Sequence, residues 1–224
     1  MVVMKARWFA PESEIAVCGH ASVIAARIYW SLIAQEPGPQ EIQFQSEDGI
    51  NRVRLQRGKV RDEVRLLLPV VQSLPMSLDC PENFHQLLGC PESVALQLYC
   101  STVPKVLIVL PTQQDVERLV PKTEAIRASN YMGVVVTAPG QSCDYVLRYF
   151  CPKNGFAEDY VTASAHGFLA PYWSKRLGKH AMTARQLSQR PCVLSVKYQK
   201  ATSFVRVTGR CCIEGKGSLY VPVE

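Results

Sequence analysis

Five side chains that can move protons or hydrogen-bond to a substrate fall in two short stretches of the sequence. Cys18 and His20 lie in the first stretch, and Asp159, Thr162 and Ser164 lie in the second. A histidine or a carboxylate can take or give a proton near neutral pH, and a hydroxyl can hold a polar group of the substrate. No glycine-rich phosphate loop, nucleotide fingerprint or cluster of metal ligands accompanies them, so we expect neither a cofactor nor a metal. The pattern indicates acid–base chemistry on a small molecule.

The two stretches look like copies of each other. Each opens with Arg, an aromatic residue, Phe, any residue and Pro, and then reaches an acidic residue and a run of small residues. The first copy starts at Arg7 and reaches Glu14, and the second starts at Arg148 and reaches Glu158. A solenoid needs three or more short units, so a single repeat of this length predicts two similar lobes. We interpret both glutamates as residues of a first helical turn that complement the helix dipole.

Aligning the copies pairs Cys18 with Thr162 and His20 with Ser164. Taken singly, each side chain has a structural alternative. His20, Asp159, Thr162 and Ser164 could cap helices, and Cys18 could be a small buried apolar residue. The matching positions of His20 and Ser164 favour a functional role for this pair.

Small residues stand where each copy begins a helical pattern. Gly19 precedes apolar residues at helical spacing from Ala21 to Leu32, and Ala163 precedes a second such pattern. A helix start carries unpaired backbone N–H groups and a partial positive charge, so both positions could hold an anionic group between the lobes. The first pattern is apolar on nearly every side, which predicts a helix buried in the middle of its lobe.

The rest of the chain predicts a mostly antiparallel sheet in each lobe. Residues 1–9 read as one strand, and residues 210–213 and 218–223 read as the last two strands. We divide the chain into a first lobe, 1–100, whose N-terminal part is missing, and a second lobe, 101–208. Residues 209–224 are expected to be C-terminal strands that return to the first lobe.

Composition and charge narrow the classes of partner and compartment. The 224 residues are 47% apolar, and the net charge of +6 is spread out. In the basic stretch 51–65 charged residues alternate with apolar ones, as in a strand with one face in solvent. We therefore expect no nucleic-acid partner. Nine cysteines at irregular spacing, with no Cys-x-x-Cys pair, indicate free thiols in a reducing cytoplasm. The first residues lack the apolar core of a signal peptide and all apolar runs are short, so no membrane partner is expected.

Longer motifs around these residues are similar to those of a known family. The chain resembles the PhzF-like family of phenazine-biosynthesis-like isomerases from Arg7 to about Gly217. The motifs that carry the resemblance are Arg7-Trp8-Phe9-Ala10-Pro11, Cys18-Gly19-His20-Ala21-Ser22, Arg148-Tyr149-Phe150-Cys151-Pro152 and the run from Gly155 to His166. The resemblance implies an α+β, diaminopimelate epimerase-like fold. This fold is a pseudo-two-fold pair of lobes, each a mostly antiparallel sheet wrapped round a central helix, with the active site in the cleft.

The resemblance also implies an activity and a set of site residues. The activity is cofactor-independent proton transfer on a small carboxylated substrate, by a protein that pairs as a homodimer. Matched position by position, the resemblance implies that His20, Asp159 and Ser164 are the catalytic residues. It implies that Gly19, Ala163, Thr162 and Cys18 bind the substrate.

Departures from the family pattern affect the same cleft. The family's N-terminal segment carries its principal acid/base Glu, which we expect to be absent here, leaving apolar core exposed around the first helix. Ala163 replaces a family Gly and adds a Cβ, and Tyr160 replaces a family Pro after Asp159. Pro191 replaces another Gly, which removes a backbone N–H and fixes φ.

Two other functions remain open. The same departures favour a non-catalytic protein that binds a small molecule or a partner. Alternatively, Cys18-Gly19-His20 resembles the first catalytic motif of proline racemase-like enzymes. With Thr162 at the matching position of the second copy, that resemblance implies a dehydratase using Cys18 and Thr162.

Overall fold

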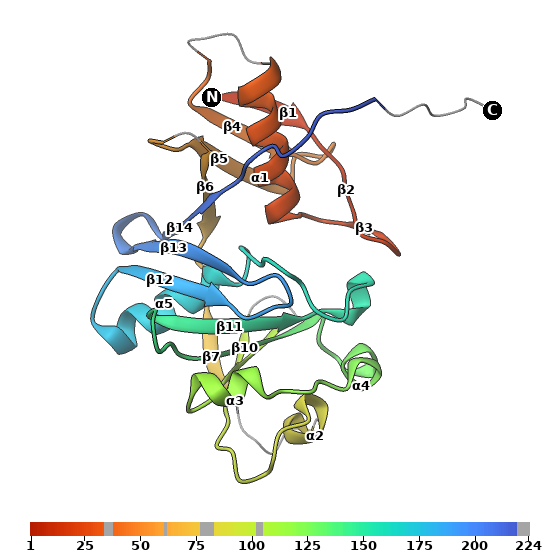
Figure 1. Cartoon of the computed structure of the whole chain (residues 1–224), viewed down its shortest axis with the longest axis vertical. Helices are drawn as coiled ribbons and strands as arrows, with labels where there is room; N and C mark the ends of the chain where they lie inside the picture. Colours follow the sequence, from red (N-terminus) through yellow and green to blue (C-terminus); the bar gives the residue numbers. More distant parts are fainter. Residues whose placement is uncertain (34–37, 61, 77–82, 102–104, 219–224) are drawn as a thin grey trace, which may run out of the picture.

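The computed structural model describes residues 1–33, 38–60, 62–76, 83–101 and 105–218. Figure 1 shows two lobes stacked along the long axis of the molecule. The upper lobe contains the N-terminal strands and helix α1, and the lower lobe contains the elements from β7 to β12 with helices α2 to α5.

One twelve-stranded sheet runs through both lobes. Its strands, in spatial order, are β1 (Val2–Lys5), β4 (Glu41–Gln45), β5 (Arg52–Arg57), β6 (Glu63–Pro69), β14 (Phe204–Arg210), β13 (Cys192–Gln199), β12 (Ala181–Gln186), β11 (Tyr145–Phe150), β10 (Gly133–Pro139), β9 (Lys105–Val109), β8 (Gln97–Ser101) and β7 (Ser73–Met76). The pairs β1–β4, β9–β10 and β11–β12 are parallel, and the other neighbours are antiparallel. A separate two-stranded sheet pairs β2 (Trp8–Phe9) with β3 (Glu14–Ile15). The mixed sheet with few helices confirms the α+β class.

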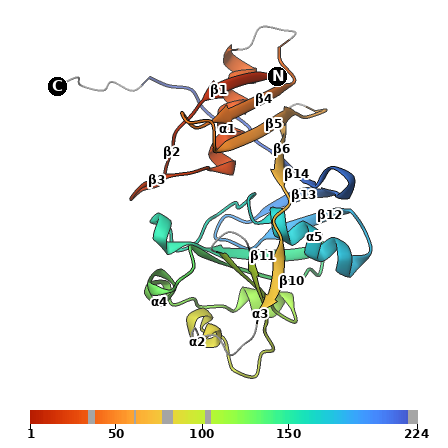
Figure 2. The ribbon, with the colours of Figure 1, turned by 180° about the vertical axis from the view of Figure 1, so that it is seen from behind.

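The lobes meet where β6 pairs with β14. This antiparallel ladder runs from Glu63 opposite Arg210 to Pro69 opposite Phe204. From β6 the chain continues past the ladder into the lower lobe and β7, as Figure 2 shows from behind. The N–H of Val71 in this connection donates to the carbonyl of Gly167. That carbonyl lacks its helical partner because Pro171, four residues on, has no N–H.

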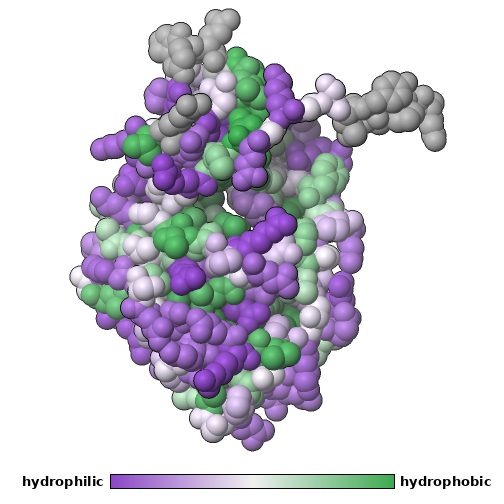
Figure 3. Space-filling view, in the orientation of Figure 1, coloured by the Kyte–Doolittle hydropathy of each residue, from purple (hydrophilic) through white to green (hydrophobic). Residues whose placement is uncertain are grey.

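Helix α1 (Gly19–Ile28), extended by the π-helical turn η1 (Tyr29–Ile33), is buried on one face only. Ala26 and Trp30 pack in the core, whereas Ile24 is 48% exposed and Ile28 39% exposed. The prediction of a helix buried on every side is therefore wrong. Strands β5 and β6 of the sheet pack against one face of α1, and Ile24 and Ile28 lie on the face that they do not cover. Its exposed apolar side chains show at the top of the surface in Figure 3.

Helix α5 (His166–Leu177) is the buried helix of the lower lobe. Phe168, Leu169 and Trp173 are at most 1% exposed. Trp173 donates from Nε1 to Thr137 on β10 at 3.0 Å, and His166 Nδ1 lies 2.7 Å from the Tyr145 hydroxyl on β11. Burial lowers the pKa of His166 to about 3, so this histidine is a neutral structural residue.

Short helices cover the opposite face of the lower sheet. They are α2 (Phe84–Leu88), α3 (Gln113–Glu117) and α4 (Thr123–Ala128), and they enclose a second apolar cluster with β8 to β11. Two 3-10 turns, η2 (Pro152–Asn154) and η3 (Lys200–Thr202), complete the described elements. No helix in the described chain combines the length and the apolar character needed to cross a membrane.

Both ends of the chain differ from the sequence prediction. Residues 1–9 form two strands, because the Ala6 N–H makes a last bond to Gln45 on β4 before the chain turns away to pair β2 with β3. At the other end β14 stops at Arg210 and residues 211–218 form no strand. The expected strand 210–213 is therefore wrong, and residues 219–223 of the other lie outside the described residues. The boundaries of the two lobes stay a prediction.

Candidate active site

A cavity of about 360 Å³ lies between the two copies of the repeat. Its walls come from the segment that leads from β2 into α1, from the segment between β11 and α5, and from Lys105 at the start of β9. All seven site residues predicted from the sequence line it: Cys18, Gly19, His20, Asp159, Thr162, Ala163 and Ser164. The tertiary fold thus brings both stretches to one place.

The repeated Arg and Glu form the same contact in each copy. Arg7 binds Glu14 through two hydrogen bonds of 3.0 and 2.7 Å, and Arg148 binds Glu158 through two of 2.8 Å. Each guanidinium also lies 4.9 Å from the ring of the Phe two residues on. The interpretation of both glutamates as first-turn helix residues is wrong, because each folds back against its arginine before the helix begins.

The start of α1 is fixed by a buried serine. Ser22 is 1% exposed; its hydroxyl donates to the Cys18 carbonyl at 2.7 Å and accepts from Trp8 Nε1 at 2.9 Å. This ties the first turn of the helix to strand β2. Cys18 itself takes an extended conformation as the N-cap residue, so its thiol turns into the cavity wall.

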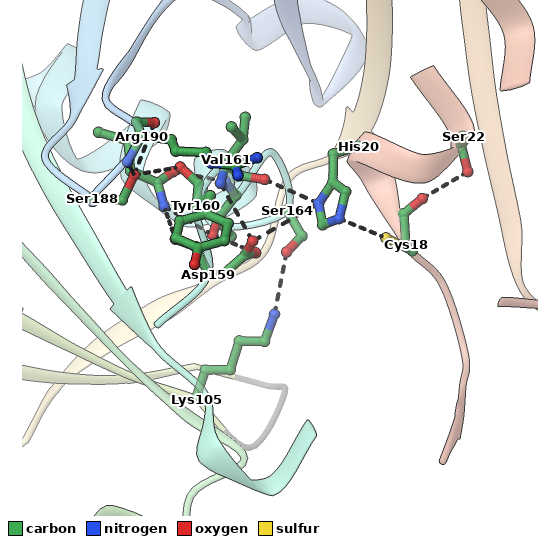
Figure 4. Close-up of polar contacts among 12 residues, drawn as sticks. Cys18, His20, Ser22, Lys105, Asp159, Tyr160, Val161, Ser164, Ser188 and Arg190 are labelled. Atoms are coloured by element: carbon green, nitrogen blue, oxygen red, sulfur yellow. Dashed lines mark hydrogen bonds and ion pairs between the residues drawn. The ribbon is translucent and has the colours of Figure 1, made fainter. Parts of the chain in front are cut away.

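His20 lies between a thiol and a carboxylate (Figure 4). Its Nε2 atom is 3.4 Å from Cys18 Sγ, and its Nδ1 atom is 3.2 Å from the Val161 carbonyl and 3.9 Å from Asp159 Oδ1. The Cys18 contact is the main cause that raises the pKa of His20 to about 9, against an opposing effect of burial. Burial raises the pKa of the Cys18 thiol, but the hydrogen bonds from His20 and the Ala21 N–H outweigh it and leave that pKa below its ordinary value. A proton shared by the pair therefore favours His20.

The carboxylate of Asp159 is held by its own loop. The Thr162 hydroxyl donates to Oδ2 at 2.7 Å, and the Val161 N–H donates to Oδ1 at 3.3 Å. Gln186 on β12 donates to the Asp159 carbonyl at 2.5 Å and accepts from the Thr162 N–H at 2.6 Å. Thr162 is 2% exposed, so its hydrogen bond to Oδ2 is shielded from water. The network holds the carboxylate with Oδ1 toward His20.

The second copy begins its helix later than the sequence predicted. Ala163 and Ser164 belong to a turn, and α5 begins at His166 with Ala165 as its N-cap. Three small residues in a row allow this tight turn, in which the Ala163 carbonyl accepts from the His166 N–H. The Ala163 methyl points at α1, where a Cβ added to Gly19 would lie 3.3 Å from it. The two predicted anion-binding positions thus lie next to each other, with no room between them for a further side chain.

Lys105 is a site residue that the sequence analysis missed. It is the first residue of β9, its Nζ donates to Ser164 Oγ at 3.3 Å, and it lies 5.1 Å from the Tyr149 ring centre. A lysine that opens an otherwise apolar strand, Lys105–Val109, was the available signal. Among the described residues, no group of three or more His, Cys, Asp or Glu side chains could hold a metal ion.

The geometry supports proton transfer on a small anion. A thiol, an imidazole and a carboxylate lie in sequence along one wall, and hydroxyl and ammonium donors lie beside them. Two lobes that share one sheet and bring their repeated segments to a common cleft are the arrangement of the diaminopimelate epimerase-like fold. A crystal structure of a putative phenazine biosynthesis PhzC/PhzF protein from Clostridium difficile superposes with a TM-score of 0.82 at 31% identity, over 97% of this chain and 78% of that one.

The family follows from the sequence comparison. Residues 2–217 match the PhzC-PhzF family model, described as phenazine biosynthesis-like protein, and the chain belongs to this family. An uncharacterized isomerase of Pseudomonas aeruginosa is 36% identical over 82% of this chain, which spans 66% of that relative. The human phenazine biosynthesis-like domain-containing protein is 30% identical over 96% of this chain and 75% of its own length.

Proposed function

We propose that this chain is a cofactor-independent isomerase that moves a proton on a small carboxylated substrate. The observation that carries the proposal is the line of Cys18, His20 and Asp159 in the cavity, with Ser164 beside it. Membership of the family, and the isomerase names of the bacterial relatives, support the same class of reaction. Because the chain spans only 66% of one such relative, the activity of the whole protein is part of the proposal.

His20 and Asp159 take the acid–base roles in this mechanism. A base removes a proton from a carbon activated by a neighbouring carbonyl or double bond, and an acid returns a proton to another carbon. With its raised pKa, His20 is protonated at neutral pH and suits the acid, while Asp159 suits the base. Ser164 holds the substrate by a hydrogen bond, and the N–H groups at Gly19 and Ala163 face its carboxylate.

The test is isotope exchange in deuterated water. Small carboxylic acids with an acidic C–H are incubated with the protein, and deuterium uptake is read by mass spectrometry. Wild type should catalyse the exchange, and His20→Asn and Asp159→Asn should each lower the rate by roughly 10²- to 10⁴-fold. Asn154→Ala, which changes a lining residue that has no role in the proposed mechanism, serves as the control. Binding of an acid without any exchange would support the non-catalytic alternative instead.

A second candidate is a thiol-based enzyme, which the contact between Cys18 and His20 favours. In the proline racemase-like mechanism Cys18 would be the base and Thr162 its partner across the cleft. The Thr162 hydroxyl is engaged with Asp159, so it suits a positioning role better than proton transfer. If Cys18 is the base, Cys18→Ser abolishes exchange and His20→Ala only weakens it; the leading proposal requires the reverse order. The homodimer stays a prediction, checked by light scattering.

A further inference from the structure

The contact between Cys18 and His20 places a nucleophile next to a base, as Figure 4 shows. Nε2 of His20 lies 3.4 Å from Cys18 Sγ, at hydrogen-bond distance for sulfur. On the other side of the ring, Nδ1 lies 3.2 Å from the Val161 carbonyl and 3.9 Å from Asp159 Oδ1, and these two oxygens orient the imidazole. A nucleophile, a base and a group that orients the base are the three parts of a thiol acyl-transfer site. The proposed proton transfer requires His20 and Asp159, but it gives the thiol no role.

The thiol also stands at the start of helix α1. Cys18 is the N-cap residue, so the N–H groups of Gly19 and His20 follow it without an acceptor inside the helix. These groups and the helix dipole favour negative charge, first on the sulfur and then on the oxygen of an attacked carbonyl group. Burial raises the pKa of Cys18, but the contacts with His20 and the Ala21 N–H outweigh it and leave this pKa below its ordinary value. Because the thiolate is the reactive form of cysteine, these contacts increase the fraction of Cys18 that can react.

Exposed apolar side chains surround the same cavity. Five of the residues that line it are large, apolar or aromatic, and at least 37% exposed: Phe9, Val17, Ile24, Phe156 and Tyr160. The first three come from the first copy of the repeat and the other two from the second copy. Exposed apolar side chains gathered around a cavity are typical of a ligand site. Proton transfer on a small carboxylate uses the polar groups of the cleft, whereas this rim fits a ligand with an apolar part.

We propose that the cleft has a second activity, the hydrolysis of small carboxylic esters with an apolar acyl group, in which Cys18 is the nucleophile. His20 is the proton carrier, and the Val161 carbonyl and Asp159 are positioning groups that hold its ring. The N–H groups of Gly19 and His20 donate to the carbonyl oxygen, and the apolar rim holds the acyl chain. This activity does not depend on the proposed isomerase, because it breaks an ester bond and leaves the C–H bonds of the substrate intact.

The reaction has two steps that balance. In the first, the Cys18 thiolate attacks the ester carbonyl carbon and a C–S bond forms. The C–O bond to the alcohol then breaks, and the imidazolium of His20 gives its proton to the leaving oxygen. In the second, neutral His20 takes a proton from water, whose oxygen attacks the same carbon. The C–S bond breaks, the carboxylic acid leaves, and the thiolate and the imidazolium are restored.

The test follows the hydrolysis of p-nitrophenyl acetate and p-nitrophenyl butyrate by the full chain. Nitrophenolate release gives kcat/KM, and mass spectrometry of the digested protein locates the acyl group. Wild type should turn over both esters and prefer butyrate by roughly 3- to 10-fold, because two more CH₂ groups contact the rim. Ile24→Ser should reduce that preference.

Variants of the nucleophile and the base are compared with a matched cysteine control. Cys18→Ser should lower hydrolysis to the rate of the ester in buffer alone, and His20→Asn should lower kcat/KM by roughly 10²- to 10⁴-fold. Cys212→Ser removes an exposed thiol outside the cavity and should change nothing. The acyl group should be found on Cys18 and should disappear as the ester is used up.

Three results would overturn the proposal. They are full turnover in Cys18→Ser, an acyl group on Cys151 in place of Cys18, and an acyl group on Cys18 that water does not remove. If Cys18→Ser does not fold, treatment of wild type with iodoacetamide takes its place, and alkylation of Cys18 should abolish ester hydrolysis. The two activities fail separately. Deuterium exchange should be only weakened in Cys18→Ser if the isomerase proposal holds, whereas ester hydrolysis should be lost in that variant.

Discussion

The imidazole of His20 holds a proton on its Nδ1 atom and presents Nε2 to the thiol of Cys18. Nδ1 lies 3.2 Å from the Val161 carbonyl, which can only accept, so this nitrogen is the donor. Nε2, 3.4 Å from Sγ, therefore either accepts from the thiol or donates to the thiolate. The contact raises the pKa of His20 to about 9 and lowers that of Cys18 below its ordinary value, so it favours the proton on the imidazole over the thiol.

The first prediction concerns the rate at which iodoacetamide alkylates Cys18. Only the thiolate reacts, so a lowered pKa makes alkylation faster at any pH below the ordinary thiol range. The pH midpoint of the rate should lie below the ordinary value of 9.0, and His20→Asn should move it upward because the stabilising hydrogen bond is lost. Mass spectrometry of digested protein gives the rate at each cysteine.

Other cysteines of the same chain provide the control. Burial raises the pKa of Cys143 and Cys192, so both should react with midpoints above the ordinary value in wild type and variant alike. A midpoint for Cys18 equal to theirs would show that the contact with His20 does not ionise the thiol.

The second prediction concerns the contact between the two lobes at Gly19 and Ala163. A Cβ at position 19 would meet the Ala163 Cβ and Leu66 Cδ2 at 3.3 Å, closer than ordinary packing. Gly19→Ala should lower the free energy of unfolding by about 1 kcal/mol through overpacking. Adding Ala163→Gly should return most of this loss, a coupling of about 1 kcal/mol in a double-mutant cycle. Urea unfolding measures all four proteins, and strictly additive effects would argue against the contact.

The third prediction compares the two copies of the Arg–Glu pair. The side chains of Arg148 and Glu158 are 13% and 17% exposed, whereas those of Arg7 and Glu14 are 66% and 46% exposed. Arg148→Met should lower the free energy of unfolding by about 3 kcal/mol, because it leaves Glu158 half-buried without its partner. Arg7→Met, with the same geometry in solvent, should change it little. Equal losses in urea unfolding would mean that burial does not distinguish the pairs.

The fourth prediction tests the support of Asp159. Thr162→Val keeps the volume and removes the hydroxyl that donates to Oδ2. Because the carboxylate then loses its orientation, the rate of deuterium exchange should fall roughly 10- to 100-fold. The affinity for the same carboxylic acid, measured by calorimetry, should stay within about twofold, since Ser164 is untouched. Thr208→Val, on β14 away from the cavity, is the matched control. An equal fall in this affinity would assign Thr162 to binding instead.

The sequence alone predicted the α+β class, the two-lobed arrangement and the residues of the cleft. The cleft residues could be identified because the two copies repeat residue types in the same order: an arginine, then an acidic residue, then a run of small residues. In the second copy the glutamate lies ten residues after the arginine, against seven in the first. The turn η2 lies within this longer segment and accommodates the extra residues, so the arginine and the glutamate form the same ion pair in both copies.

Other features were decided only by tertiary packing. Local spacing makes α1 apolar on most sides, but which side is covered depends on the sheet beneath it, so Ile24 and Ile28 are exposed. Lys105 reaches Ser164 because β9, β10 and β11 lie next to one another, a strand order that periodicity does not encode. The sequence therefore determined which residues could do chemistry. The sheet decided their partners, because hydrogen-bonded neighbours from distant parts of the chain set the distances within the cleft.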